Sequence, residues 1–153
     1  MDTTVWSTPA MGMVPTSETV RENKYITTAG RVKFKVGEAG KITFIAPVTV
    51  SLPSGEYALR AQLERTVPDL LGTEIQLRRA RRGDGAVETI LACVGVQGGP
   101  VTNNVRSTSS PIKTLAVDLS QHFYWVQVTD VNNNPATPES VDAVIGVEIV
   151  RVS

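Results

Sequence analysis

The sequence predicts an all-β protein, a single antiparallel β-sandwich of jelly-roll type with about eight strands. Stretches rich in Val, Ile and Thr alternate apolar and polar residues with a period of two, and Gly, Pro and Asn separate them. No stretch shows a convincing helical period. An immunoglobulin-like sandwich needs about seven strands and is the alternative, although its Cys…Trp…Cys spacing is missing. A chain of 153 residues is long enough to bury one core without disulfides. Cys93 is the only cysteine, so an internal disulfide is excluded.

The segment His122–Val131 is the predicted central strand, because aromatic and β-branched residues fit a pleated, half-buried surface. Side chains alternate across a strand, so Phe123 and Trp125 should share one face. Tyr124 and Val126 should point to the other face. One face of this strand is expected to meet the core, and the other to meet solvent or a neighbouring chain.

The other strands follow from the same alternation. They are expected over residues 31–36, 41–52, 56–66, 73–82, 86–97, 112–119 and 141–152. Pro47 cannot donate to a ladder, which predicts a break or bulge there. Gly83-Asp84-Gly85 predicts a hairpin turn between two of these strands. The strand over 86–97 is apolar on both faces, which predicts an internal position.

Residues 1–30 are predicted to be an extended N-terminal arm, and residues 31–153 the β-sandwich domain. Thr, Ser, Pro and Gly dominate the arm, yet five apolar residues are interspersed: Val5, Trp6, Met11, Met13 and Val14. Two interpretations stand beside each other. The arm packs along its own domain, or these side chains bind a partner, for which Trp and Met are well suited.

Two further regions are candidates for partner contact. Residues 98–111 form a long polar loop that includes Asn103, Asn104 and Arg106. Arg78 and Arg82 are expected on the face of their strand opposite Ile75 and Leu77. They either protect an edge strand or bind an acidic protein partner.

The residues that could carry chemistry favour a protein that is not an enzyme and holds no metal or cofactor. His122 is the only histidine, and Asp118 and Ser120 lie near it, but no nucleophile elbow of the G-x-S-x-G type occurs. Cys93 lies in an apolar stretch, which is typical of a buried, inert thiol. Asp130 with Asn132–Asn134 offers oxygen ligands, but turn chemistry explains this group better than Ca²⁺ does.

The charge pattern favours neither nucleic acid nor a membrane as partner. Fifteen basic and fifteen acidic residues cancel. No run approaches the roughly 18 apolar residues of a membrane span. The N-terminus lacks the basic and apolar regions of a secretory signal, so synthesis and folding in a cytoplasm are expected.

Four segments together resemble small jelly-roll proteins of phage virions, of the capsid decoration and head-fibre type. They are LPSGEYALRAQLER, IQLRRARRGDGAVETILACV, HFYWVQVTDV and AVIGVEIV, within residues 31–152. The resemblance implies a homotrimer on the virion surface, assembled in the host cytoplasm. It also implies the major capsid protein or another virion protein as partner.

Two functions follow as hypotheses. The first is a structural protein that binds and stabilises a larger assembly, a phage capsid, without chemistry. The second is a glycan- or receptor-binding module of a tail fibre or adhesin. Its site would place Trp125 or Tyr124 beside Asn132–Asn134, although aromatic residues are only 5% of the chain.

Overall fold

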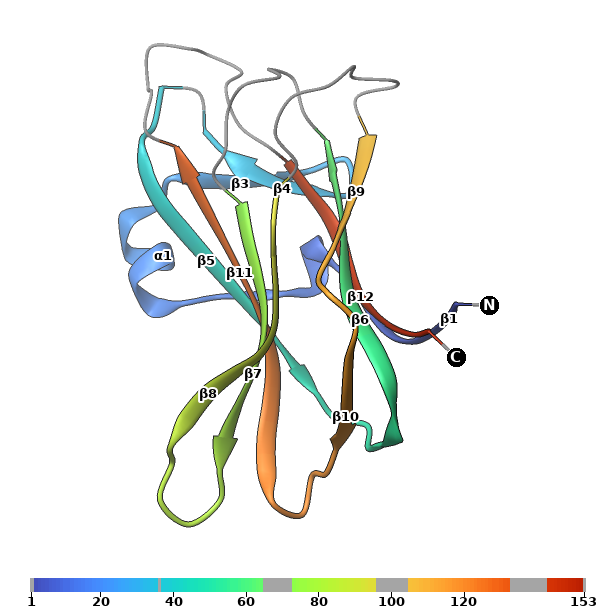
Figure 1. Cartoon of the computed structure of the whole chain (residues 1–153). Coiled ribbons are helices and arrows are strands. Elements are labelled where there is room, and N and C mark those ends of the chain that lie inside the picture. The colour runs from blue at the N-terminus through green and yellow to red at the C-terminus, as the bar shows by residue number, and fades with distance from the viewer. Residues whose placement is uncertain (1, 36, 65–72, 96–104, 133–142, 153) are drawn as a thin grey trace.

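The chain folds into two antiparallel β-sheets that face each other across one core, as the computed structural model in Figure 1 shows. It describes residues 2–35, 37–64, 73–95, 105–132 and 143–152. The elements are β1 (Thr3–Pro9), η1 (Ala10–Gly12), β2 (Val14–Pro15), α1 (Ser17–Glu22), β3 (Tyr25–Thr28), β4 (Arg31–Phe34), β5 (Gly40–Val48), β6 (Leu52–Glu64), β7 (Thr73–Arg81), β8 (Val87–Val94), β9 (Val105–Ser109), β10 (Lys113–Val117), β11 (His122–Asn132) and β12 (Ala143–Arg151).

The strands divide into a sheet of seven and a sheet of five. The larger sheet has the order β10-β6-β12-β4-β3, with β1 also paired to β12 and β9 to β6. The smaller sheet has the order β2-β5-β11-β7-β8. The prediction of an all-β, antiparallel, two-sheet sandwich is therefore confirmed.

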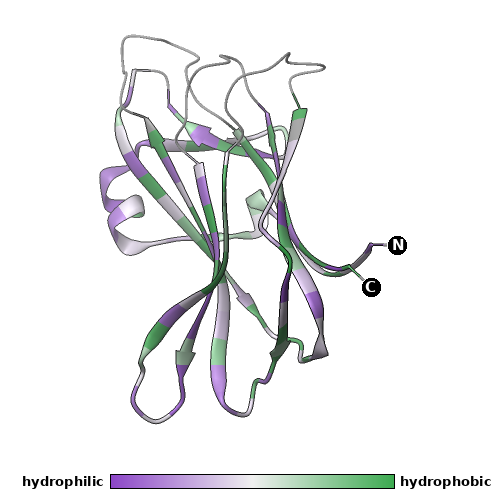
Figure 2. Cartoon of the chain, viewed as in Figure 1, coloured by the Kyte–Doolittle hydropathy of each residue, from purple (hydrophilic) through white to green (hydrophobic). Residues whose placement is uncertain are grey.

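The core consists of the side chains on the facing sides of the two sheets. Figure 2 shows apolar and polar positions alternating along the strands that enclose it. On β6, Tyr57, Leu59 and Leu63 are fully buried, as the alternation predicts. Fully burying one such side chain contributes about 1.5–3 kcal/mol relative to leaving it exposed. These inner residues therefore hold the two sheets together.

β11 lies in the middle of the five-stranded sheet, as predicted. It pairs with β5 on one side and β7 on the other, and neither ladder contains a register shift. Tyr124, Val126 and Val128 are buried, whereas Phe123 is 55% exposed. The predicted separation of the two faces of this strand is confirmed.

The expectation of a separate arm over residues 1–30 is corrected, because both sheets include strands from this segment. β1 pairs with β12, β2 with β5, and β3 with β4. Ala10 and Met13 are buried in the core. Short strands that complete existing sheets carry little alternation of their own, which is why the sequence pattern did not separate them from an arm.

A short helix was also missed. Thr16 caps α1 by accepting a hydrogen bond from the backbone N–H of Thr19, and Asn23 ends it in the left-handed conformation. The Thr19 hydroxyl accepts a hydrogen bond from the backbone N–H of Thr43, at 2.9 Å. A helix of six residues that is held to β5 by polar groups does not require an apolar periodicity, so the sequence pattern did not indicate it.

Three local predictions differ from the structure. Pro47 interrupts no pairing with β11, because β2 covers the other side of β5 only at Phe44 and Ile45 and leaves that edge open. β8 is an edge strand rather than an internal one, with Val94 61% exposed. The predicted loop over 98–111 contains β9, which pairs with β6.

We predict that Met11 and Met13 differ sharply in their contribution to stability. Met13 is 6% exposed and Met11 is 49% exposed. Met13→Ala should lower the free energy of unfolding by about 2–5 kcal/mol, because it leaves a cavity in the core. Met11→Ala is the matched control and should change it by less than about 0.5 kcal/mol. Chemical denaturation measures both, and equal, small effects would contradict the packing of this segment into the core.

A candidate binding groove on the five-stranded sheet

An open groove of about 480 Å³ lies on the outer face of the five-stranded sheet. It is lined by Ile45, Pro47, Val48, Thr49, Arg82, Leu119, Phe123, Tyr124 and Trp125. These residues come from the end of β5, the turn after β7, the turn between β10 and β11, and the start of β11, in the lower half of the molecule in Figure 1. Its volume lies within the range of small-ligand sites, and its lining is mostly apolar with few polar groups, as in such sites.

Phe123 and Trp125 form an aromatic shelf in this groove. They lie two residues apart on one face of β11, so their Cα atoms are about 6.6–6.8 Å apart. Pro47 lies directly across from Trp125 on β5. Tyr124 also borders the groove, but its side chain is 4% exposed and faces the core. The shelf therefore consists of Phe123 and Trp125.

Two arginines lie against the shelf. The Arg82 guanidinium is 4.0 Å from the centroid of the Phe123 ring, and that of Arg78 is 5.9 Å from the Trp125 ring. Both are cation–π contacts. Arg82 Nε also donates to the carbonyl oxygen of Leu119 at 2.8 Å, which fixes the side chain beside the ring. The predicted position of Arg78 and Arg82 on the face opposite Ile75 and Leu77 agrees with these contacts.

Polar side chains continue along the same face of the sheet. Gln127 follows Trp125 on this face of β11 and lies across from Gln76 on β7. Arg78 Nη1 donates to Gln127 Oε1 at 3.5 Å, and Gln76 donates to Glu74. Hydrogen-bonding groups therefore lie beside the aromatic shelf.

Of the asparagines proposed from the sequence for a glycan site, the structure describes the backbone of Asn132, which lies far from this groove. Asn132 is at the far end of β11, across from Gly40, seven residues beyond Trp125. At about 3.4 Å per residue this places the two Cα atoms roughly 24 Å apart. Asn133 and Asn134 lie outside the described residues. Asp130 points into the core, where its carboxylate accepts a hydrogen bond from Thr73 at 3.0 Å.

Asp118, Ser120 and His122 do not form a nucleophile–base–acid relay. The Ser120 hydroxyl donates to Asp118 Oδ1 at 2.6 Å, and the Ser120 backbone N–H donates to the same oxygen at 3.0 Å. These two bonds lower the pKa of Asp118. The His122 ring instead lies edge-on to Tyr124, at 5.8 Å between centroids. Ser120 therefore stabilises the turn before β11.

The predicted partner-binding residues of the N-terminal segment lie in different surroundings. Val5 and Trp6 are half-buried on β1 and pack against the core, and Met13 lies within it. Met11 and Val14 are 49% and 57% exposed. Of the other predicted contact residues, Arg106 is in β9, and Asn103 and Asn104 lie outside the described residues. A role in partner binding stays a prediction for these residues.

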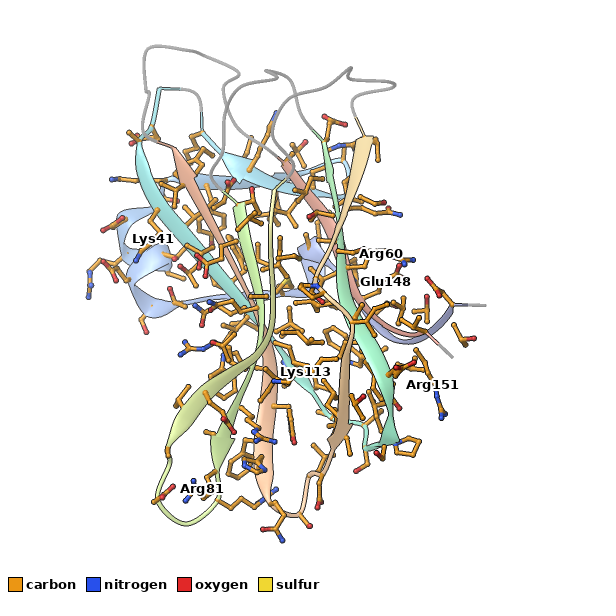
Figure 3. All side chains as sticks on the ribbon, viewed as in Figure 1. Lys41, Arg60, Arg81, Lys113, Glu148 and Arg151 are labelled. Carbon is orange, nitrogen blue, oxygen red and sulfur yellow. The ribbon has the colours of Figure 1, made fainter. Side chains whose placement is uncertain are left out.

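A second, polar hollow lies on the seven-stranded sheet, between β1, β6 and β12. Arg60 crosses it, pairing with Asp2 at 2.9 Å and with Glu148 at 3.8 Å. Figure 3 labels Arg60 and Glu148 side by side on this sheet. Thr4 also donates to Glu148, at 2.8 Å. The charged and polar groups of this hollow pair with one another. They hold β1 against the sheet, and this structural role explains the hollow.

Cys93 lies on β8, 7% exposed, with its side chain in the core. Burial raises the pKa of this thiol to about 11, although contact with Thr108 opposes the shift. The described residues contain no group of three metal-ligating side chains, and within them no helix is both long and apolar enough to cross a membrane.

Comparisons with known proteins show a distant likeness of fold. No protein-family model matches the chain, and no curated protein matches it. Similar solved structures include the β-sandwich carbohydrate-binding module TmCBM61 in complex with beta-1,4-galactotriose, with a TM-score of 0.42 and 13% identity over 91% of this chain and 86% of that one.

Two further structures are similar at a lower level. The Arthrobacter globiformis T6 isomalto-dextranase complexed with panose has a TM-score of 0.36 and 12% identity, over 82% of this chain and 17% of that one. The Eiger TNF from S. frugiperda has a TM-score of 0.29 and 12% identity, over 84% of this chain and 69% of that one. These likenesses concern the sandwich alone, and no residue role is transferred from them.

We predict that Cys93 is unreactive in the native protein. A thiol reagent attacks the thiolate, which a pKa of about 11 makes scarce at pH 8. Modification at pH 8 should be slow for the native protein and fast in denaturant. Because the folded state holds its proton more tightly than the unfolded state, this group's contribution to stability should also fall as pH rises from about 9 to 11. Rapid native modification at pH 8 would contradict the burial of this side chain.

Proposed function

We propose that this chain is a non-catalytic module that binds carbohydrate in the groove on the five-stranded sheet. The observation that carries this proposal is the exposure of Phe123. The chain has three Phe, three Tyr and two Trp, and the structure describes them all. Phe123 is 55% exposed, whereas the other seven are buried or half-buried, and it lies in the same groove as Trp125.

A sugar ring fits such a shelf better than other small ligands do. One face of a pyranose ring carries several C–H groups, which are attracted to the negative face of an aromatic ring. The hydroxyl groups at the rim of the sugar need donors and acceptors, and Gln127, Gln76 and Arg78 supply both beside the rings. Because the groove is open and lies across a sheet, it also leaves room for a chain of sugar rings to continue past it.

The experiment is affinity electrophoresis of the protein through gels that contain soluble polysaccharides. At least one polysaccharide should retard the native chain, and Phe123→Ala should abolish the retardation. Ile112→Ala is the matched control, because Ile112 is 56% exposed and lies before β10, outside the groove. Loss of binding in both variants, or in neither, would contradict the groove as the binding site.

Tryptophan fluorescence gives an independent measurement of the same site. The chain has only two tryptophans, Trp6 on β1 and Trp125 in the groove. A bound sugar should change the emission of the native protein and of Trp6→Phe, but not that of Trp125→Phe. A response that follows Trp6 would place the ligand on the other sheet.

A second candidate function is assembly into a larger structure, as expected for a capsid decoration protein. The observation that favours it is a set of exposed aliphatic residues along the side formed by β8, β9 and β10. Val94 is 61% exposed, Val105 42% and Ile112 56%. Main-chain pairing through β8 is already limited, because Thr108 and Lys113 donate to the carbonyl oxygens of Val94 and Ile90. Copies would therefore associate through side chains.

The assembly candidate predicts a homotrimer in solution. Light scattering at high micromolar concentration should then give three times the mass of one chain. Val94→Asp should reduce the measured mass to that of a single chain. A charge at a fully desolvated aliphatic contact is costly, so one substitution suffices. A clean monomer would contradict this candidate and leave the carbohydrate proposal unaffected.

A further inference from the structure

We infer that the ligand of the groove is an anionic carbohydrate, a polysaccharide that carries carboxylate or sulfate groups. This inference rests on the proposed function and specifies its substrate class. It is carried by the two arginines that flank the aromatic shelf. Unlike Arg79 and Arg81, these two have no carboxylate partner among the described residues.

Four arginines lie near the end of β7, and they divide into two pairs. Arg79 forms an ion pair with Glu88, and Arg81 forms one with Asp84 at 3.2 Å. Arg78 and Arg82 have no carboxylate partner within the part of the chain that the structure describes. This division follows the faces of the strand. Arg79 reaches the inner residue Tyr124, whereas Arg78 lies on the outer face with Trp125.

The acidic groups close to the groove already have partners. Glu88 and Asp84 hold Arg79 and Arg81, and Asp118 accepts both hydrogen bonds from Ser120. Glu74 accepts from Gln76 and lies across from Thr129, four residues along β11 from Trp125. None of the residues that line the groove is acidic. Among the described residues, therefore, no carboxylate pairs with either arginine of the shelf.

The arginines also retain hydrogen-bonding capacity. Arg82 uses Nε on the carbonyl oxygen of Leu119, and its two terminal nitrogens have no partner among the described residues. Arg78 makes one long bond from Nη1 to Gln127, and its Nε is buried with no hydrogen-bond partner in the described part of the chain. A guanidinium presents paired N–H groups that match the two oxygens of a carboxylate or sulfate.

The geometry favours an acidic sugar over an acidic peptide. A peptide gains affinity by adding a strand to a free sheet edge, but β11 is paired on both sides. On the open edge of β5, Pro47 has no N–H to donate to an added strand. The groove instead offers flat rings with a cation above each. A pyranose ring that stacks on the part of Phe123 or Trp125 left uncovered would bring a substituent carboxylate or sulfate beside Arg82 or Arg78.

The test compares two ligands that differ only in charge. Polygalacturonate and its fully methyl-esterified form share a backbone, but the ester carries no carboxylate. Alginate, heparin, chondroitin sulfate and neutral galactan complete the panel, and poly-glutamate supplies negative charge without sugar. The full-length protein is measured by affinity electrophoresis and by Trp125 fluorescence. At least one acidic polysaccharide should bind at least about tenfold more tightly than its uncharged counterpart or neutral galactan.

Substitutions assign that preference to the two arginines. Arg78→Gln and Arg82→Gln should each weaken binding of the acidic polysaccharide about tenfold, and the loss should be larger at low salt because rim charges are screened. Arg81→Gln is the matched control, since Arg81 is 62% exposed and paired at the hairpin labelled in Figure 3. It should bind as the native chain does. Equal losses in all three variants would assign the effect to net charge and overturn the inference.

The remaining outcomes separate this inference from the proposed function. Equal, Phe123-dependent binding of neutral and acidic polysaccharides would overturn the inference and leave the proposed function standing. Binding of poly-glutamate as tight as that of the polysaccharides would mean that charge, not sugar, is recognised, and would overturn the inference. Retardation by no polysaccharide in the panel would overturn both.

Discussion

The groove depends on one constraint, the alternation of side chains along β11. β5 and β7 hold this strand in a continuous register on both sides. A shift by one residue would turn Tyr124, Val126 and Val128 out of the core and bring Phe123 and Trp125 into it. The core therefore fixes which aromatic rings face outward. Nothing in the core requires that residue 123 be aromatic, since a polar side chain would fit the same exposed position.

Local geometry explains the parts of the structure that the sequence predicted. The period of two separates the faces of β6 and β11 because successive side chains of any strand alternate. The hairpin between β7 and β8 is set by glycines at positive φ, 105° at Gly83 and 71° at Gly85, where other residues are strained. The placement of Arg78 and Arg82 opposite Ile75 also follows from counting along one strand. All these inferences needed only neighbours in the sequence.

The parts that sequence did not predict depend on contacts between distant segments. The groove joins Pro47 to Trp125 and Arg82 to Leu119, pairs that are brought together by strand order and register. The N-terminal segment contributes strands of two to seven residues, which are too short to show a period and are held by partners far along the chain. Ala10 and Met13 are buried and Met11 is exposed because of the way this segment docks on the sheets. β8 looked internal because its exposed valines resemble core residues.

An arginine over an aromatic ring has a simpler explanation, that it shields the ring from water. Shielding alone does not account for three features of this groove. Phe123 is still 55% exposed with Arg82 stacked above it. The Arg82 side chain is held beside the ring by its bond to the Leu119 carbonyl oxygen, which lowers the entropy cost of positioning it for a ligand. Arg78 leaves its Nε buried without a hydrogen-bond partner among the described residues, which shielding the ring does not require. An exposed ring beside two arginines that have no carboxylate partner among the described residues fits the anionic ligand inferred above.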